Sequence, residues 1–383
     1  MQRQPVHTVY VPADRFEAGT VAAYGEQALA ALDEHAATAA ALAELLGGTG
    51  LDVDDDLLAR VRDKLAREPV EDLRVDVEDG YGHRPDAEED DAVLAAARVL
   101  AVPGSAGPPF YGLRFKSLEP ATRERGLRSL RLFVTELVTA AGHDRLAGLT
   151  AGLRLTLPKV TDVEQVEALA EACAVLEREH ALAPLRIELQ VETPESIMAA
   201  DGTVPLPAMI AAAGGRCIGL HYGTYDYSAA LGIAAAYQSM EHPAADHAKA
   251  VMQVAAARCG GAVQLSDGST NVLPVGDRAA VRAAWRLHAR LVRRSLERGF
   301  YQGWDLHPAQ LVTRYLATYS FYRQGLREAT ARLTAYLHDT HDTGPGYLDE
   351  PATAAALAGF LLRGVECGAV DEGETGQSGQ SLA

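Results

Sequence analysis

The chain has 383 residues, of which 48% are hydrophobic, and its formal net charge is -17. A chain of this size can bury a large core, which predicts either one large α/β domain with an appendage or two ordinary domains. The negative charge argues against nucleic acid or an anionic membrane surface as the main partner, because both would repel it. The cysteines form no CxxC pair, and no apolar run of about 18 residues occurs, so we expect a cytoplasmic protein.

Short β-branched or apolar runs alternate with long segments of helical period along the chain. This pattern is typical of a parallel sheet with crossover helices. Eight such runs favour a closed (β/α)₈ TIM barrel over an open sheet. The predicted strands lie at residues 7–12, 73–79, 110–116, 152–159, 185–192, 217–223, 261–266 and 299–307.

The segments between these runs carry helix signals. Apolar residues recur at helical spacing from Val163 to Leu176, which predicts an amphipathic helix packed on the barrel wall. Pro205, Pro243 and Pro308 mark helix starts, because a proline in the first turn loses no intrahelical hydrogen bond.

The pattern changes after about residue 320. Residues 1–320 are predicted to form the barrel domain, and residues 321–370 a helical C-terminal appendage. Residues 371–383 are polar and rich in Gly and Ser, so we expect a disordered tail.

Charged residues follow most of the predicted strands. In a (β/α)₈ barrel the chemistry lies at the carboxyl ends of the strands. A ring of charges at that end is costly to desolvate unless the charges pair or hold a metal. The residues are Glu78 and Asp79, Arg114 and Lys116, Lys159, Glu192, Asp226, Asp267 and His307.

Glu192 and Asp226 follow neighbouring predicted strands, so their carboxylates could approach one ion. Two oxygen ligands with open positions suit Mg²⁺, with Mn²⁺ as an alternative. The competing interpretation is that each carboxylate caps the following helix or pairs with Arg114. The spacing alone leaves both interpretations open.

Six short motifs then occur in register: LRVDVEDGYG, GLRFK, LTLPKV, QVETPESI, HYGTYDYSAALG and WDLHPAQL. Together they resemble the strand signatures of the citrate lyase beta-subunit (CitE-like) superfamily, which includes the HpcH/HpaI aldolases. The resemblance covers about residues 6–313, and GYLDEP resembles that superfamily's C-terminal lid segment. The chain is identified as a divergent branch.

The resemblance implies a barrel that assembles as a homotrimer or hexamer. It implies that Glu192 and Asp226 hold Mg²⁺ and that Arg114 binds a carboxylate or carbonyl of the substrate. It also implies that the C-terminal appendage is a lid, whose Asp349 acts in the site of a neighbouring subunit.

Several positions depart from the superfamily pattern and indicate a substrate of its own. His83 and Arg84 follow strand two where a small residue is usual, and Lys116 stands where an asparagine is usual. We expect Arg84, Lys116 and Lys159 to contact the substrate, and Asp79 and His83 to contribute to catalysis. In its Pro-Lys-Val context Lys159 is more typical of a carboxylate-pairing lysine than of a Schiff-base nucleophile.

The implied reaction is carbon–carbon cleavage or formation on a hydroxy- or keto-acid, or its CoA thioester, through an enolate that the metal stabilises. Such a lyase or aldolase needs a Lewis acid, a nearby cation and a proton-transfer group, here Asp349 or His83. Two alternatives remain: a thioester hydrolase on the same site, and a non-catalytic assembly subunit.

Overall fold

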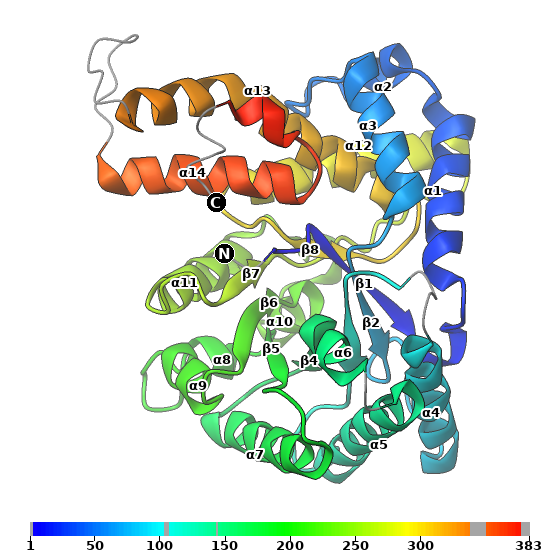
Figure 1. The fold of residues 1–383 in the computed structure, drawn as a ribbon, viewed down its shortest axis with the longest axis vertical. Helices are drawn as coiled ribbons and strands as arrows, with labels where there is room; N and C mark the ends of the chain where they lie inside the picture. Colours follow the sequence, from blue (N-terminus) through cyan, green and yellow to red (C-terminus); the bar gives the residue numbers. More distant parts are fainter. Residues whose placement is uncertain (1–2, 103–106, 143–144, 338–349, 377–383) are drawn as a thin grey trace.

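The fold, seen in a computed structural model, is built on eight parallel strands (Figure 1). The structure describes residues 3–102, 107–142, 145–337 and 350–376. The strands run in the order β7-β6-β5-β4-β3-β2-β1-β8, and every pair is parallel. They are β1 (His7–Pro12), β2 (Asp72–Asp76), β3 (Phe110–Arg114), β4 (Leu153–Leu157), β5 (Arg186–Val191), β6 (Cys217–Tyr222), β7 (Gln264–Ser266) and β8 (Gly303–Asp305).

The sheet closes between its two edge strands through a few backbone contacts. Ser266 at the end of β7 bridges Gln302 just before β8. Asp267 N donates to Gln302 O at 2.8 Å, and Trp304 N donates to Gly268 O at 3.2 Å. The (β/α)₈ barrel predicted from the sequence is confirmed.

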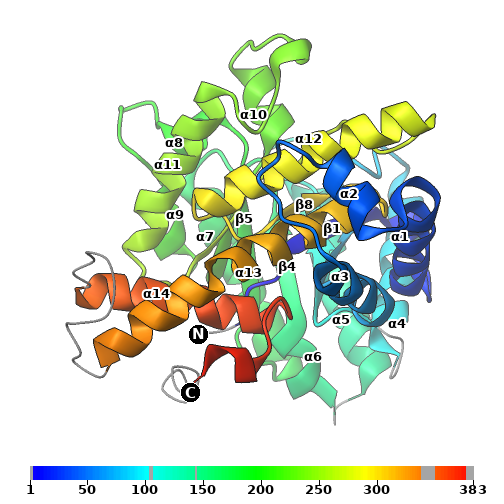
Figure 2. The same cartoon turned by 90° about the horizontal axis from the view of Figure 1, so that it is seen from above.

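Helices surround the barrel (Figures 1 and 2). Pro243 begins α11 and Pro205 directly precedes α9, as the proline signals predicted, whereas Pro308 lies two residues before α13. The helices are α1 (Thr20–Ala36), α2 (Ala39–Leu45), α3 (Asp55–Arg67), α4 (Asp86–Ala101), α5 (Arg123–Ala141), α6 (Leu146–Gly152), α7 (Val163–His180), α8 (Pro194–Ile197), α9 (Leu206–Ala212), α10 (Thr224–Ala230), α11 (Pro243–Ala257), α12 (Arg278–Glu297), α13 (Gln310–Leu337) and α14 (Pro351–Glu366), with short 3₁₀ turns at Ala13–Arg15, Ala235–Tyr237 and Glu372–Thr375.

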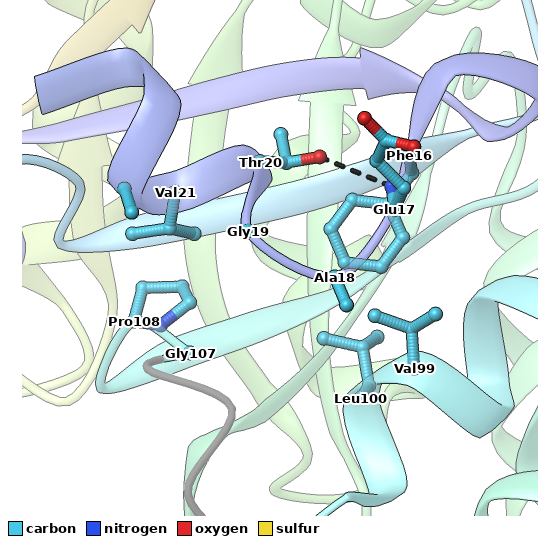
Figure 3. Close-up of a pocket in the computed structure, with 11 residues that line it drawn as sticks. Phe16, Glu17, Ala18, Gly19, Thr20, Val21, Val99, Leu100, Gly107 and Pro108 are labelled. Carbon is cyan, nitrogen blue, oxygen red and sulfur yellow. Dashed lines mark hydrogen bonds between the residues drawn. The ribbon is translucent and has the colours of Figure 1, made fainter. Parts of the chain in front are cut away.

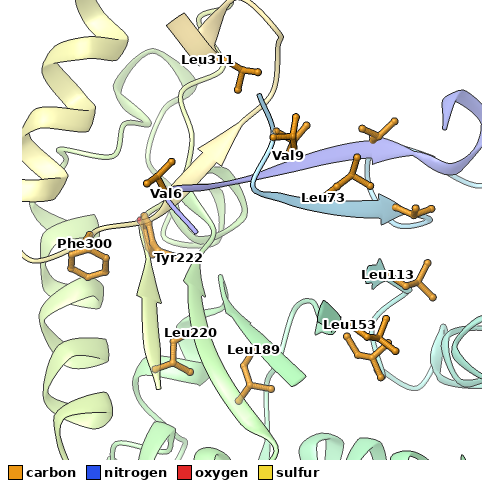
Figure 4. Packing of buried hydrophobic residues seen from close by; sticks show 14 of the residues in the cluster. Val6, Val9, Leu73, Leu113, Leu153, Leu189, Leu220, Tyr222, Phe300 and Leu311 are labelled. Atoms are coloured by element: carbon orange, nitrogen blue, oxygen red, sulfur yellow. The ribbon is translucent and has the colours of Figure 1, made fainter. Parts of the chain in front are cut away.

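Residue alternation along the strands separates an apolar outer face from a polar interior. On β2, Leu73 and Val75 are fully buried in the apolar core outside the barrel, and Figure 4 shows Leu73 among the strand side chains of that core. Asp72, Arg74 and Asp76 alternate with them and point inward. Burial of apolar side chains against the helices therefore stabilises the wall, while the lumen is free for polar groups.

The interior is held by a buried charge network instead of layers of aliphatic side chains. The guanidinium of Arg74, on β2, is completely buried and donates to Asp72, to Glu188 at 2.6 Å and to Thr156 at 2.8 Å. Because all three acceptors come from inward positions on strands β2, β4 and β5, the network fixes these strands relative to one another.

The C-terminal helices α13 and α14 lie side by side outside the barrel (Figures 1 and 2). Ala329 and Leu333 of α13 pack against Ala354 and Leu361 of α14. Helix α13 is continuous through residue 320, where the sequence suggested a domain boundary. Asp349 lies outside the described residues, as do residues 377–383 of the predicted tail. None of the described helices has both the length and the apolar character needed to span a bilayer.

Candidate active site at the carboxyl ends of the strands

Arg114, the last residue of β3, is fixed by the last residue of β2. Its Nε donates to Asp76 Oδ1 and its Nη2 to Asp76 Oδ2, both at 2.7 Å. The guanidinium lies over the ring of Tyr10, 4.6 Å from the centroid. Burial opposes its charge, but Asp76 more than offsets this and raises the pKa of Arg114 well above its usual range. Arg114 is therefore a permanent, oriented cation, and its Nη1 lies 3.8 Å from Glu78.

Asp76 also shapes the loop that follows β2. Its carboxylate accepts hydrogen bonds from Glu78 N at 3.0 Å and Gly80 N at 2.9 Å. A Cβ at Gly80 would lie 2.5 Å from Asp76 Oδ2, so any larger residue here would displace the Asp76 carboxylate. The loop thereby directs Glu78 and Asp79 toward the centre of the barrel mouth.

Lys159 connects the carboxylates at the mouth. Its ammonium forms hydrogen bonds with Glu78 and, at 2.8 Å, with Asp79, and it lies 4.0 Å from Asp226 Oδ1. Burial disfavours the charge, but Glu78, Asp79 and the nearby charge of Glu192 outweigh it and raise the pKa of Lys159. A lysine that stays protonated is a poor Schiff-base nucleophile, so this geometry agrees with a carboxylate-pairing role.

The backbone at Lys159 is held in the left-handed region with φ of 50°. That conformation is uncommon for a residue with a side chain and costs conformational energy. It lets Lys159 N donate to Glu192 Oε1 at 2.8 Å while the ammonium reaches Glu78 and Asp79. One residue thus positions carboxylates from two different strands.

Glu192 and Asp226 lie near enough for the charge of Asp226 to act on Glu192. Glu192 follows β5 and is 2% exposed, whereas Asp226 is half-buried in the first turn of α10. Burial and the nearby charge of Asp226 raise the pKa of Glu192 to about 8. Burial also raises the pKa of Asp226. Each carboxylate is therefore held where its negative charge is costly.

The chain makes room for the second oxygen of Glu192 by placing glycine opposite it. A Cβ at Gly223 would lie 2.2 Å from Glu192 Oε2 and 2.4 Å from its Cβ. Among the described residues, Glu192 accepts a hydrogen bond only at Oε1, from Lys159 N. Oε2 is thus left to meet a ligand beside Asp226.

These features fit a divalent cation. Two clustered carboxylates with raised pKa values would be stabilised by a nearby positive charge. No group of three or more His, Cys, Asp and Glu side chains that could hold a metal occurs in the described part of the chain, so the protein ligands would be this pair alone. Mg²⁺ suits such a site, because it commonly keeps several waters or substrate oxygens.

Other residues predicted for the site lie at its edge or are engaged elsewhere. Lys116 donates to Val77 O at 2.8 Å and lies 3.2 Å from Glu89 beneath the loop after β2. Arg84 pairs with Asp14 at 2.7 Å and with Glu88 at 2.8 Å. His83 is exposed in the same loop.

Asp76 and Tyr10 are the residues at this site that the sequence interpretation did not assign. Asp76 could have been placed by strand alternation, since it shares the inward face of β2 with Asp72 and Arg74. Tyr10 gave no such signal, because an aromatic residue in a strand is usually a packing residue.

A surface pocket elsewhere has no comparable chemistry (Figure 3). It is lined mainly by backbone and by apolar side chains, including Phe16, Val99, Leu100 and Pro108. The hydrogen bond drawn in Figure 3 runs from Glu17 N to Thr20 Oγ1 at 3.0 Å and joins the loop before α1 to the first residue of that helix. None of the predicted site residues lines it.

A sequence-family profile described as "Domain of unknown function (DUF6986)" matches residues 1–383. The chain belongs to this family. No curated protein matches the chain. Solved structures show what this member of the family resembles in fold.

A citrate lyase from Burkholderia xenovorans LB400 superposes with a TM-score of 0.64 at 19% identity, covering 99% of this chain and 96% of that chain. CitE from Mycobacterium tuberculosis, in complex with magnesium, acetoacetate and coenzyme A, gives a TM-score of 0.53 at 17% identity over 94% and 98% of the two chains. A Haloferax volcanii malate synthase in a lead(II) complex gives 0.53 at 14% identity over 94% and 91%. The resemblance to the citrate lyase beta-subunit superfamily is confirmed at the level of the fold.

Proposed function

We propose that this protein is a Mg²⁺-dependent carbon–carbon lyase or aldolase acting on a hydroxy- or keto-acid, or its CoA thioester. The observation that carries the proposal is the pair of buried and half-buried carboxylates, Glu192 and Asp226, at the barrel mouth that also holds the cation of Arg114. Similar barrels in complex with magnesium and small keto-acids or coenzyme A support the substrate class.

Glu192 and Asp226 would hold the metal, which supplies a Lewis acid for the substrate's oxygens. Arg114 would bind the carboxylate or carbonyl oxygen on which negative charge develops when the carbon–carbon bond breaks. Its Nη1 is the nitrogen available for this, since Nε and Nη2 are bound to Asp76. Because Asp76 already fixes the guanidinium, Arg114 loses little further conformational entropy when it binds and orients the substrate.

Lys159 and the loop after β2 would determine the net charge at the mouth of the barrel. The ammonium pairs with Glu78 and Asp79, so the negative charge that an anionic substrate meets there is reduced. Asp79 would contact the substrate or the metal's waters through its exposed side. The proton transfer is assigned to Asp349 of the lid or to His83.

A product assay tests the reaction class. The purified protein is incubated with Mg²⁺, or with a chelator, and with β-hydroxy acids and their CoA thioesters, and products are identified by mass spectrometry. We expect the substrate to be cleaved into two products only when Mg²⁺ is present. This cleavage should be lost in Asp226→Asn and kept in Asp91→Asn, because Asp91 is an exposed residue of α4. Free CoA with an intact carbon chain would indicate the thioester hydrolase instead. Metal binding without any product would favour a non-catalytic subunit.

A further inference from the structure

Four inward-facing side chains form a closed ring across the barrel beneath Arg114. The Tyr10 and Trp304 rings lie 4.8 Å apart, and those of Trp304 and His221 6.5 Å apart, measured between centroids. Gln190 is the register partner of His221 and donates from Nε2 to the Tyr10 hydroxyl at 3.1 Å. The four residues come from the neighbouring strands β8 and β1 and from β5 and β6 across the barrel, so their contacts link two opposite walls.

Three polar atoms of this ring are buried without a partner. Gln190 Oε1, His221 Nδ1 and Trp304 Nε1 have no hydrogen-bond partner within the part of the chain that the structure describes. Gln190 and His221 are at most 1% exposed, and Tyr10 and Trp304 are 8% exposed. Buried polar atoms normally find a partner in protein or in a bound molecule, so three in one ring indicate an occupant.

The ring offers both donors and acceptors. Trp304 Nε1 can only donate, and Tyr10 has its own hydroxyl proton to donate, since burial raises its pKa. Gln190 Oε1 accepts. His221 Nε2 faces Glu188 Oε2 at 3.5 Å, which leaves Nδ1 as the imidazole nitrogen of the ring.

We propose that the ring of Tyr10, Gln190, His221 and Trp304 binds a neutral hydroxyl oxygen. A hydroxyl both donates and accepts, whereas a carbonyl or carboxylate only accepts and an ammonium only donates. The oxygen comes either from the hydroxyl of a substrate or from a water molecule held in the barrel.

The substrate source rests on the proposed function, because it requires an acid bound at the mouth. Gln190 lies on the inward face of β5, two positions before Glu192, which follows the strand. Arg114 lies over the Tyr10 ring, 4.6 Å from its centroid. The ring therefore lies next to the groups proposed to bind the acid. A hydroxy acid held by Arg114 and the carboxylate pair could direct its hydroxyl down into the ring.

Matched ligands and matched variants test the site. Malate, oxaloacetate and succinate differ only at C2, which carries a hydroxyl, a carbonyl oxygen or hydrogen. Their affinities are measured by calorimetry with Mg²⁺, and crystals of the full chain are examined with and without Mg²⁺. Trp304→Phe removes one donor and keeps an aromatic ring. Trp285→Phe is its control, because Trp285 is fully buried and already donates to Ala309 O at 2.8 Å, outside the ring.

If the hydroxyl comes from substrate, the wild-type protein should bind malate about tenfold more tightly than succinate and oxaloacetate. Trp304→Phe should abolish most of this preference, and Trp285→Phe should keep it. If the occupant is water, the acids should show no such preference. The crystals should then show an ordered oxygen bonded to Trp304 Nε1 and Gln190 Oε1 that is lost in Trp304→Phe.

A preference for malate that survives Trp304→Phe would overturn the proposal. It would also be overturned if the wild-type protein shows no preference for malate and its crystals show no ordered oxygen in the ring. Tyr10→Phe, which keeps the ring under Arg114, serves as the second variant if Trp304→Phe does not fold. The crystal and binding results need no turnover, so failure of this site and failure of the proposed reaction are distinguishable.

Discussion

Asp76 holds Arg114 through two hydrogen bonds of 2.7 Å, one to Nε and one to Nη2. Both side chains are nearly sealed from solvent. Because a carboxylate and a guanidinium match in a planar two-bond geometry, Asp76 fixes the plane and the direction of the cation. The remaining nitrogen, Nη1, is thereby held in one position before any substrate arrives.

Arg114→Lys should keep the fold and lose most activity. Lysine keeps the charge but cannot bond Asp76 at two points and present a third nitrogen to the substrate. We expect kcat/KM to fall by about 100-fold, the size of effect seen when an oriented donor to developing charge is removed. Arg125→Lys is the control, because Arg125 pairs with Glu89 and Asp90 between α4 and α5. Near wild-type kinetics in Arg114→Lys would place the anion elsewhere.

Mg²⁺ affinity should rise with pH through Glu192. Its pKa of about 8 means that the carboxyl is mostly protonated at neutral pH without a metal, and the proton must leave before the oxygen can ligate. We expect the apparent Kd to fall by about tenfold per pH unit up to about pH 8 and then to level off. Calorimetry in buffers of different ionisation heat should show proton release on binding. A pH-independent affinity would contradict the assignment.

The same shift predicts how metal-free stability depends on pH. A folded-state pKa near 8, raised from 4.5, favours the folded protein fully below pH 4.5, and this contribution is lost as the pH rises through 8. Glu192→Gln should therefore flatten the decline in the denaturation midpoint between pH 5 and pH 8. An unchanged decline in that variant would show that other groups cause it.

Gly223→Ala should disturb the metal site while leaving the barrel folded. The backbone at Gly223 has φ of -98°, which any residue adopts, so the obstacle is the contact of the new Cβ with Glu192. We expect Mg²⁺ affinity to fall at least tenfold, because the carboxylate must move away from Asp226. Gly373→Ala is the control, since nothing lies within 4 Å of its Cβ position. Unchanged Mg²⁺ binding would mean that Glu192 Oε2 is not a ligand.

Asp349 is predicted to complete the site of a neighbouring subunit. It stands in GYLDEP, whose last two residues are Glu350, the N-cap of α14, and Pro351, its first residue. Asp349→Ala and Arg114→Ala proteins should each be inactive, and co-assembly of the two should restore part of the activity. If mixing never restores turnover, or if a monomer is fully active, Asp349 does not act in trans.

The sequence by itself determined the barrel fold and the presence of charged residues at the carboxyl ends of its strands. Eight apolar runs that alternate with helical segments leave few other ways to bury their surface, and their ends all meet at one rim because the strands are parallel. For this reason Glu192 and Asp226, which follow the adjacent strands β5 and β6, could be expected near each other, although their spacing left open whether they share an ion.

Only the tertiary structure decided which side chains engage one another at that rim. Lys116 and Arg114 stand two residues apart at the end of β3, yet Lys116 pairs with Glu89 and Arg114 with Asp76. The choice depends on how the loop after β2 folds back over β3, which no local pattern encodes. The ring of Tyr10, Gln190, His221 and Trp304 likewise joins residues up to almost 300 positions apart. The closure of the strands into a barrel brings these residues together, and periodicity along the chain does not show which strands will face one another.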